Sequence, residues 1–390
     1  MIYLDNNATT RPSDACVEAM RRADAEAWFN PSSVHRAGQL ARQQVELARR
    51  DLAALINAKP RELTFTSGGT ESIHLAIQGA LAALPPPKRE LITTEIEHAA
   101  IRDLAEDLGV LARAKVTLIA PGPDGLIDPA AIERALTPTT GLISVQWANN
   151  ETGAIQPVRE IAAIARAKNT LFHIDATQWV GKQPTSVRDQ DDPWCDLLTF
   201  SPHKFHGPKG VGVLWASPRV RLRPPVPGSQ ELGRRGGTEN VSGIIGAGVA
   251  AREAAAWLNN PTSPAPRATL AALRDRFEST ILSLYPDARI NGPRDHRRLW
   301  NTTNIAFPRL EAEALLLMLS ERGVCASAGA ACSSGSLDPS PILLAMGVPP
   351  PLAHGSLRFS LSRESLESEV MTAAAITADC AHHLRRALPG

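Results

Sequence analysis

Short apolar runs alternate with amphipathic stretches from about residue 13 to residue 255. An apolar run of about four to eight residues between polar ones is typical of a strand buried on both faces. A longer stretch, with apolar residues three or four positions apart, is typical of a helix that covers a sheet. The alternation of the two patterns predicts an α/β domain in which helices cover a mostly parallel sheet.

The strand pattern recurs at seven places, which are residues 63–66, 90–93, 116–119, 141–146, 170–174, 197–200 and 211–215. We therefore expect a sheet of about seven strands. The clearest helix pattern covers residues 39–56, where Leu40, Val45, Leu47, Leu52 and Leu55 are the apolar contribution.

Three prolines within residues 259–266 interrupt the alternation. Because proline ends helices and is excluded from central strands, this cluster indicates a linker. Helix and strand patterns resume after it with a different spacing. We expect a large domain over residues 13–258 and a smaller α+β domain made of residues 1–12 and 267–390.

The composition is that of an ordinary globular chain, with 43% apolar residues among 390, enough for a large core. Its 41 basic and 40 acidic residues give a formal net charge of +1, so we do not expect it to bind nucleic acid directly. The start of the chain lacks the pattern of a signal peptide, and no apolar run approaches the roughly 18 residues of a membrane span. These features predict a cytoplasmic protein without a membrane segment.

The five cysteines are scattered and odd in number: Cys16, Cys195, Cys325, Cys332 and Cys380. Their spacing fits neither a disulfide framework nor a metal site, so we expect reduced thiols and no bound metal. Cys332 lies within a run of small residues, 328–336, that is too polar and flexible for a core helix. We expect a flexible loop that carries a thiol there, whereas Cys16 and Cys195 are expected to be small buried apolar residues.

An acid and a lysine follow two of the strand patterns, which places them at neighbouring strand ends. Asp175 comes directly after residues 170–174, and Lys204 follows residues 197–200. Pyridoxal 5'-phosphate (PLP) needs a lysine that holds it as a Schiff base and a carboxylate that keeps its pyridine nitrogen protonated. The pair therefore suggests PLP chemistry. Each residue alone also has a structural explanation, since such a lysine is usually solvated and such an aspartate often caps a loop.

The sequence TSGGTES at residues 66–72 lies where a strand pattern changes to a helix pattern. Glycines there let the backbone approach a phosphate closely, and the first N–H groups of a helix favour an anion. An ordinary helix cap is an equally good interpretation, with Ser67 or Thr70 as the capping residue and Glu71 in the first turn.

These residues belong to a longer series of motifs. In chain order they are residues 3–10 (YLDNNATT), 66–72 (TSGGTES), 97–98 (EH), 149–153 (NNETG), 175–178 (DATQ), 203–204 (HK), 235–240 (RGGTEN), Cys332 and 358–360 (RFS). The series resembles that of cysteine desulfurases of the NifS/IscS-like group, in the class V aminotransferase family of fold-type I PLP enzymes. The resemblance spans nearly the whole chain and implies the fold-type I architecture.

For the cofactor, the resemblance implies that Lys204 forms the Schiff base and that Asp175 pairs with the pyridinium nitrogen. Gln178 would hydrogen-bond the phenolic oxygen, and His98 would stack on the ring. The phosphate would be held by Gly69, Thr70, Ser201 and His203. Thr238 would reach the phosphate of the neighbouring subunit, which implies a homodimer.

For the substrate, the resemblance implies that Arg358 binds the α-carboxylate through two parallel hydrogen bonds, with Asn150 as a second donor. Without the resemblance, a surface ion pair would be the better interpretation of this arginine.

The implied activity converts L-cysteine to L-alanine and leaves the sulfur on Cys332 as a persulfide, with Lys204, Cys332 and His98 as the catalytic residues. The sulfur would then pass to an acceptor protein such as an iron–sulfur scaffold, or to another thiolation pathway. Cys325, close to the expected loop, is a candidate redox or resolving thiol. The alternatives are a PLP-dependent selenocysteine lyase, C–S lyase or aminotransferase, and a non-catalytic binding protein with the same fold.

Overall fold

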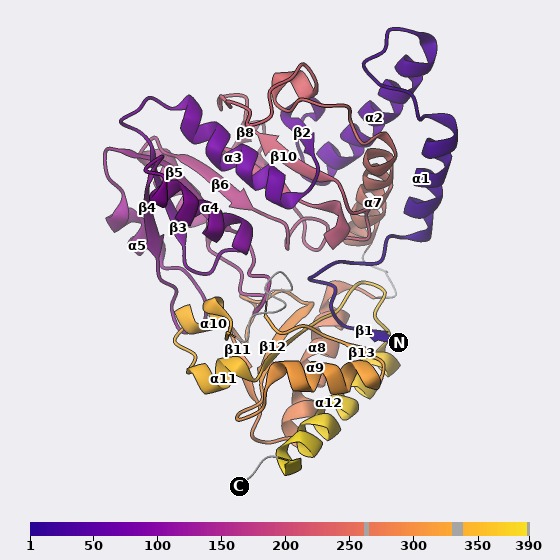
Figure 1. The fold of residues 1–390 in the computed structure, drawn as a ribbon, viewed down its shortest axis with the longest axis vertical. Coiled ribbons are helices and arrows are strands. Elements are labelled where there is room, and N and C mark those ends of the chain that lie inside the picture. The colour runs from indigo at the N-terminus through magenta and orange to yellow at the C-terminus, as the bar shows by residue number, and fades with distance from the viewer. Residues whose placement is uncertain (261–264, 330–337, 388–390) are drawn as a thin grey trace.

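A computed structural model describes residues 1–260, 265–329 and 338–387. The large sheet and its helices fill the upper part of Figure 1, and a smaller sheet with further helices fills the lower part. The helices are α1 Asp14–Glu26, α2 Arg36–Leu55, α3 Gly69–Ala83, α4 Ala99–Val110, α5 Pro129–Ala135, α6 Val158–Ala167, α7 Val241–Asn259, α8 Arg267–Leu284, α9 Ala312–Glu321, α10 Pro341–Ala345, α11 Pro350–His354 and α12 Glu367–Ala387. Among the residues that the structure describes, no helix is apolar over a length that would cross a membrane.

The large sheet has seven strands in the order β2-β10-β9-β6-β5-β3-β4. They are β2 Leu63–Thr66, β3 Glu90–Thr94, β4 Lys115–Ile119, β5 Thr140–Gln146, β6 Leu171–Asp175, β9 Leu197–Phe200 and β10 Gly212–Ala216. Only β10 is antiparallel to its neighbours in this sheet. The seven strands predicted from the sequence are confirmed, and their ends differ from the prediction by at most one residue.

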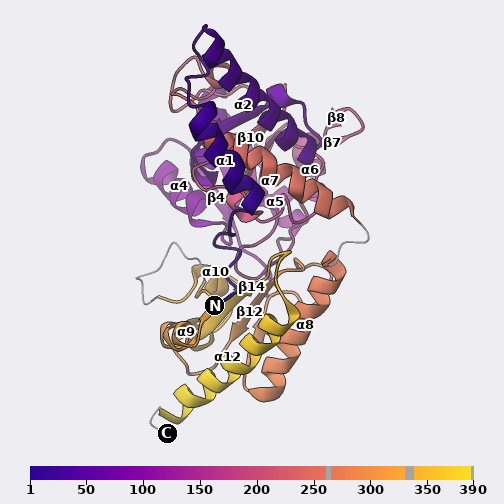
Figure 2. The ribbon, with the colours of Figure 1, turned by 90° about the vertical axis from the view of Figure 1, so that its right-hand side faces the viewer.

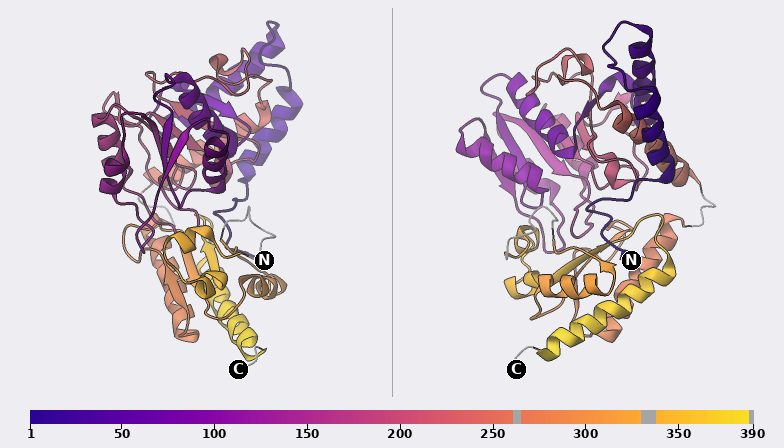
Figure 3. Two further views of the ribbon diagram at one scale, coloured as in Figure 1. Left: turned by 60° about the vertical axis from the view of Figure 1, so that its left-hand side comes forward. Right: turned by 45° about the vertical axis from the view of Figure 1, so that its right-hand side comes forward.

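Helices cover both faces of this sheet, as the two views in Figure 3 show. Leu91 and Leu142 belong to the apolar cluster under α3 and α4. The next residues along the same strands, Ile92 and Ile143, belong to the cluster under α2, α5, α6 and α7. Successive side chains of a strand point to opposite faces, so strands buried on both sides need the continuous apolar runs seen in the sequence.

The predicted helix 39–56 is present as α2, but its buried face differs from the predicted one. Leu40 and Leu47 are 53% and 43% exposed, whereas Ala41 and Ala48 are buried. The small residues matter because α7 packs closely against this face. A Cβ atom at Gly248 of α7 would lie 2.7 Å from the Cα atom of Ala48.

The smaller sheet consists of β11 Arg289–Asn291, β12 Thr302–Ala306 and β14 Ser356–Ser360. Figure 2 shows α8 and α12 side by side along it. The N-terminal strand β1 Ile2–Tyr3 pairs in parallel with β13 Val324–Cys325. A separate two-stranded sheet joins β7 Arg188–Asp189 to β8 Asp192–Pro193.

Leu4 shares one apolar cluster with residues between 270 and 381. This separate cluster supports our proposal of two domains. The short helices α10 and α11 are an exception within residues 267–390, because Ile342, Leu343 and Ala353 pack on the core of the large sheet.

We expect Gly248→Ala to destabilise the protein by about 1–3 kcal/mol, because the added methyl group would force α2 and α7 apart. The matched control is Gly109→Ala in α4, where a Cβ atom meets nothing within 4 Å. That change should stabilise the helix by roughly 0.5–1 kcal/mol. Urea unfolding of both variants measures the difference, and equal stabilities would contradict the proposed packing.

Candidate active site

The segments that follow β2, β3, β5, β6 and β9 surround a cavity of about 210 Å³. Because β10 alone is reversed, these five strands end at the same edge of the sheet. The cavity lies at that edge. It is lined by nine of the residues predicted from the sequence, which are Gly69, Thr70, His98, Asn150, Asp175, Gln178, Ser201, His203 and Lys204.

Two predicted residues that the structure describes do not line this cavity. Arg358 borders it through Asn150, whose backbone oxygen accepts a hydrogen bond from Arg358 Nη1 at 3.3 Å. Thr238 is exposed on the segment that leads into α7. Cys332 lies outside the described residues.

Lys204 ends the short helical turn Pro202–Lys204 and is half-buried. Its Nζ donates to the backbone oxygens of Asn7 and Ala8, both at 2.7 Å. Asp175, at the end of β6, is buried, and its Oδ1 accepts from the Thr177 N–H at 3.0 Å. The amine and the carboxylate therefore lie on the wall of one cavity, although 29 positions separate them in the chain.

His98 is the N-cap residue of α4, and its Nδ1 accepts from the Ala100 N–H at 3.1 Å. Burial is the largest cause of a lowered pKa for this imidazole, which outweighs the opposing effect of Asp175. A ring whose Nδ1 accepts a hydrogen bond carries its proton on Nε2. His98 therefore presents a flat neutral ring with a single N–H donor.

The turn before α3 also lines the cavity, through Gly69 and Thr70. Gly68 is the N-cap, and among the described residues no side chain caps this helix end. The alternative prediction, a cap by Ser67 or Thr70, is therefore wrong. A Cβ atom at Gly69 would stand 3.7 Å from the Thr177 hydroxyl. That hydroxyl is buried and has no partner among the described residues, so this end offers free N–H groups and a free hydroxyl.

Arg358 lies on β14 and is 1% exposed. Its Nη2 donates to Asp5 Oδ1 at 2.6 Å, so a buried guanidinium pairs with a half-buried carboxylate, and this is not the surface pair considered from the sequence. Arg358 Nε and Asn150 Oδ1 are both buried without a partner in the described part of the chain. Buried groups of this kind usually have partners, so a polar ligand is expected between them.

The segment that precedes Cys332 in the chain passes next to Arg358. Ser327 and Arg358 exchange two backbone hydrogen bonds, of 3.2 Å from Ser327 N and 2.7 Å from Arg358 N. Ser327 is five positions before Cys332 in the chain. The described structure thus brings the start of the predicted cysteine loop to the border of the cavity.

Two residues next to the predicted ones were missed by sequence reasoning. Asn7 accepts hydrogen bonds from Lys204 and Gln178 with its backbone oxygen, at 2.7 Å and 3.0 Å. Lys182 donates to Gln178 Oε1 at 2.6 Å. The closeness of Lys182 to Gln178 in the chain, four positions, was an available signal.

Glu97, which precedes His98 in the chain, is completely buried. It accepts hydrogen bonds from Thr94 Oγ1 at 2.7 Å and from the Gln146 N–H at 3.1 Å and 3.0 Å. Burial raises the pKa of this carboxyl to about 8, and the charge of Asp175 adds to the effect.

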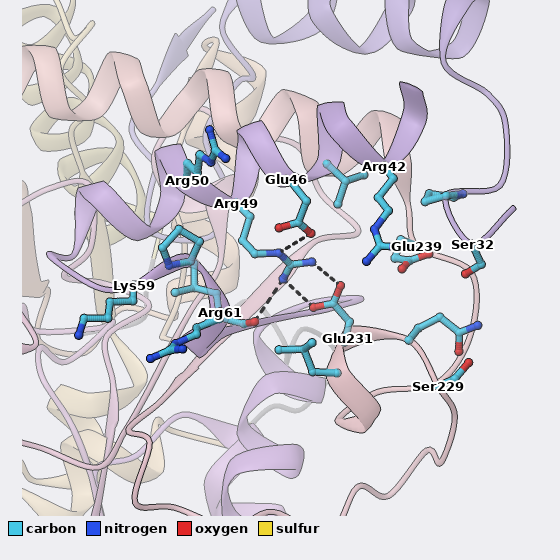
Figure 4. A pocket seen from close by; sticks show the side chains of 16 residues that line it. Ser32, Arg42, Glu46, Arg49, Arg50, Lys59, Arg61, Ser229, Glu231 and Glu239 are labelled. Carbon is cyan, nitrogen blue, oxygen red and sulfur yellow. Dashed lines mark hydrogen bonds and ion pairs between the residues drawn. The ribbon is translucent and has the colours of Figure 1, made fainter. Parts of the chain in front are cut away.

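A second cavity of about 520 Å³ lies between α2 and the segment that leads to Thr238. Figure 4 shows Arg49 in this cavity, held between Glu46 and Glu231. The Glu231 contact is bidentate, at 2.8 Å and 2.7 Å, and the guanidinium also lies 4.4 Å from the centre of the Phe65 ring. Both partners are 7% exposed, so this is a buried ion pair.

This ion pair anchors a strained turn. Glu231 and Leu232 have φ angles of 47° and 59°, a region that residues other than glycine seldom adopt. Further along the same segment, Arg235 Nε donates to Glu71 Oε1 at 2.9 Å and so joins it to the start of α3. Thr238 is held between these contacts and the N-cap residue of α7, Asn240.

The four described cysteines are free thiols. Cys16 and Cys195 are 0% and 1% exposed, which confirms the prediction of small buried residues. Burial raises the pKa of both thiols, to about 11 for Cys16. Cys325 is half-buried on β13.

The sequence matches the family described as Aminotransferase class-V over residues 2–372. It is 42% identical over 390 residues to a cysteine desulfurase of Nostoc sp. (strain PCC 7120), which covers 100% of this chain and 95% of that protein. A solved structure of a NIFS-like protein has a TM-score of 0.89 and 35% identity, covering 98% of this chain and 100% of the other. SspA, solved in complex with cysteine, has a TM-score of 0.80 and 32% identity, covering 94% and 100%. These similarities confirm the family resemblance and the fold-type I architecture predicted from the sequence.

We expect Glu231→Gln to destabilise the protein by about 3–5 kcal/mol, because it leaves the buried Arg49 guanidinium without its main counter-charge. The control is Glu367→Gln, which breaks an exposed pair with Arg276 and should cost less than about 1 kcal/mol. Urea unfolding of the two variants tests this. A similar loss in both would show that the Arg49 pair behaves as a surface contact.

The raised pKa of Glu97 predicts a specific pH dependence of stability. The unfolded carboxyl ionises near pH 4.5 and the folded one near pH 8, so its stabilising contribution is complete below pH 4.5 and is lost as the pH rises through 8. Glu97→Gln cannot ionise. The free energy of unfolding of the variant, relative to wild type, should therefore increase between pH 5 and pH 9, and a difference independent of pH would contradict a raised pKa.

Proposed function

This chain belongs to the aminotransferase class-V family, and we propose that it is a cysteine desulfurase that moves the sulfur of L-cysteine to Cys332 and releases L-alanine. The observation that carries the proposal is the single cavity that brings together Lys204, Asp175 and His98. The similarity to a cysteine desulfurase over the full chain supports this choice among the reactions of the family.

We infer that PLP is the cofactor, and the residues of the cavity fit it. Lys204 supplies an amine and Asp175 a carboxylate on one wall. The free N–H groups before α3 and the unpartnered Thr177 hydroxyl suit a phosphate. We propose that Gly69, Thr70, Ser201 and His203 hold this phosphate. When bound, PLP would supply an electron sink for the bonds broken at the substrate Cα.

We propose that Lys204 holds the cofactor and then carries the proton that leaves the substrate Cα. Asp175 would keep the pyridine nitrogen protonated. The flat neutral ring of His98 would lie against the cofactor and exclude water from its face, and Gln178 would donate to the phenolic oxygen. Neutral His98 is supported by the burial that lowers its pKa.

The substrate carboxylate would be bound between Arg358 and Asn150. Both contribute a buried polar atom that has no partner in the described part of the chain, Arg358 Nε and Asn150 Oδ1. Because Asn150 Oδ1 can only accept, its amide would turn to donate to the carboxylate. Asp5 holds the other side of the guanidinium and sets its plane.

Sulfur transfer requires a thiol near the substrate, and we propose Cys332. Its thiolate would attack the substrate sulfur, the Cβ–S bond would break, and the carbon would gain a proton to give alanine. The sulfur stays on Cys332 as a persulfide, so cysteine plus thiol gives alanine plus persulfide. The short distance in sequence between Cys332 and Ser327, which pairs with Arg358, supports this role.

We propose a homodimer in which Thr238 contacts the phosphate bound by the neighbouring subunit. Its exposure, together with the anchors at Glu231 and Glu71, supports this arrangement. The persulfide would pass to an acceptor protein such as an iron–sulfur scaffold, or to another thiolation pathway.

Two variants separate the proposed roles. Cys332→Ser should retain the absorbance of lysine-bound PLP but lose protein persulfide and alanine formation from L-cysteine, whereas Lys204→Ala should lose the lysine-bound absorbance itself. The loss of alanine formation should exceed about a hundredfold, because the nucleophile is removed. Mass spectrometry of the protein and quantification of alanine are the measurements.

The control is Cys325→Ser, which removes a half-buried thiol and should leave both products unchanged. Alanine formation that survives Cys332→Ser would contradict the assignment of the nucleophile. Free sulfide with pyruvate in place of alanine would instead indicate a C–S lyase.

A further inference from the structure

A second lysine, Lys182, contacts Gln178, which lines the cavity of the proposed cofactor site. Lys182 is 4% exposed, and its Nζ donates to Gln178 Oε1 at 2.6 Å and to Asn7 Oδ1 at 2.9 Å. Both partners are uncharged amide oxygens. Buried lysines are uncommon and are usually paired with an acid. Burying this amine without an acidic partner costs free energy, which calls for a functional explanation.

The backbone holds Lys182 and Gln178 in a fixed relation. Residues 176–183 form two hydrogen-bonded turns on either side of Gly181, whose φ is 77°; the N–H of Val180 donates to Ala176 O at 2.9 Å and that of Gln183 to Trp179 O at 3.0 Å. These turns bring the side chains of Gln178 and Lys182 into direct contact. Lys182 is fixed from the smaller domain as well, because Trp300 Nε1 donates to its backbone oxygen at 3.0 Å.

The contact with Lys182 determines which way the Gln178 amide faces. An amide turned by 180° would place its NH₂ group against the donating amine of Lys182, which is unfavourable. With Oε1 on Lys182, Nε2 donates one hydrogen to the Asn7 backbone oxygen at 3.0 Å. Its second hydrogen is left for a ligand. The same Asn7 oxygen accepts from Lys204 Nζ at 2.7 Å, so the three side chains form one network.

We propose that Lys182 is a positioning residue, which holds the Gln178 amide so that its second N–H points to the phenolic oxygen of PLP and thereby lowers the pH at which the cofactor-bound Lys204 nitrogen titrates. The inference rests on the proposed function, because it takes Gln178 and Lys204 as ligands of PLP. A hydrogen bond donated to the phenolic oxygen makes that oxygen a poorer partner for a protonated neighbouring nitrogen.

The charge of Lys182 acts in the same direction as this hydrogen bond, because it also disfavours protonation of the Lys204 nitrogen. Burial lowers its pKa well below the usual value, and the nearby Lys204 and Arg358 lower it further. The charge of Lys182 in turn lowers the pKa of His203 and of His206. Any positive charge that remains on Lys182 opposes protonation of the Lys204 nitrogen. A substitution that removes the Lys182 amine therefore removes both the positioning of the Gln178 amide and the charge effect on the Lys204 nitrogen.

The test is a pH titration of the visible absorbance of PLP-loaded protein, wild type and Lys182→Met. We expect the midpoint to rise by roughly one pH unit, since a polar contact and a nearby charge are lost. The PLP dissociation constant should increase by about tenfold, as expected for one lost hydrogen bond. Lys168→Met, at an exposed lysine after α6, is the matched control and should change neither quantity.

A double-mutant cycle tests whether Lys182 acts through Gln178. In a Gln178→Ala background, Lys182→Met should shift the midpoint and the affinity less than it does in the wild-type background, because the positioned amide is already absent and only the direct charge effect of Lys182 is lost. Lys182→Gln keeps an N–H donor, although one bond nearer the backbone, so its midpoint should lie between those of wild type and Lys182→Met. It also serves if the methionine variant does not fold, which urea unfolding of each variant shows.

The inference would be overturned if, in a folded Lys182→Met protein, the ionisation constant given by the midpoint and the PLP dissociation constant both lay within twofold of wild type. This holds even if the stability of the variant falls. Fully additive effects in the cycle would overturn the action through Gln178. Both results leave the proposed function intact. Wild-type protein that binds no PLP would instead overturn the proposed function, and this inference with it.

Discussion

The structure depends on the complete hydrogen bonding of one buried residue, Asn7. It is 1% exposed, so each of its polar groups needs a protein partner. Its backbone oxygen and side-chain oxygen each accept two hydrogen bonds, and its N–H and amide nitrogen donate three. The partners are Lys182, Gln178, Lys204, Asn150, Asn301, Thr302 and Ser360. They come from loops of the large sheet and from the smaller sheet, so a displacement of Asn7 would disturb both walls of the cavity at once.

Burial sets the charges of the cavity. Desolvation is the first cause of the lowered pKa of His98, His203 and Lys182, and of the raised pKa of Glu97. All four shifts favour the uncharged form. Charge is thereby concentrated on the few groups with a fitting partner, such as the Arg358 and Asp5 pair. This pattern suits a site where an anionic cofactor and a zwitterionic substrate would supply the remaining charges.

The segment that carries Thr238 obeys a different constraint. It adopts strained backbone angles at Glu231, and these persist because the Glu231 carboxylate binds Arg49 and the Phe65 N–H at 2.7 Å. The buried ion pair has little stabilising value of its own, since desolvation offsets most of its attraction. The pair nevertheless fixes the conformation of the turn at Glu231. The exposed Thr238 is thus presented outward, in the direction that a shared site between two subunits would require.

The sequence by itself determined the seven strands and the order of the motifs, because strand patterns are local and motifs are contiguous. It also predicted that Asp175 and Lys204 would meet, since parallel strands place their carboxyl ends at one edge. Only the tertiary structure decided the buried face of α2, the burial of Arg358 and the network of Asn7 and Lys182. Those features arise from contacts between residues far apart in the chain: the Asn7 and Lys182 pair spans 175 positions. No local pattern records such a contact, because burial and hydrogen-bond geometry exist only after the two sheets have packed.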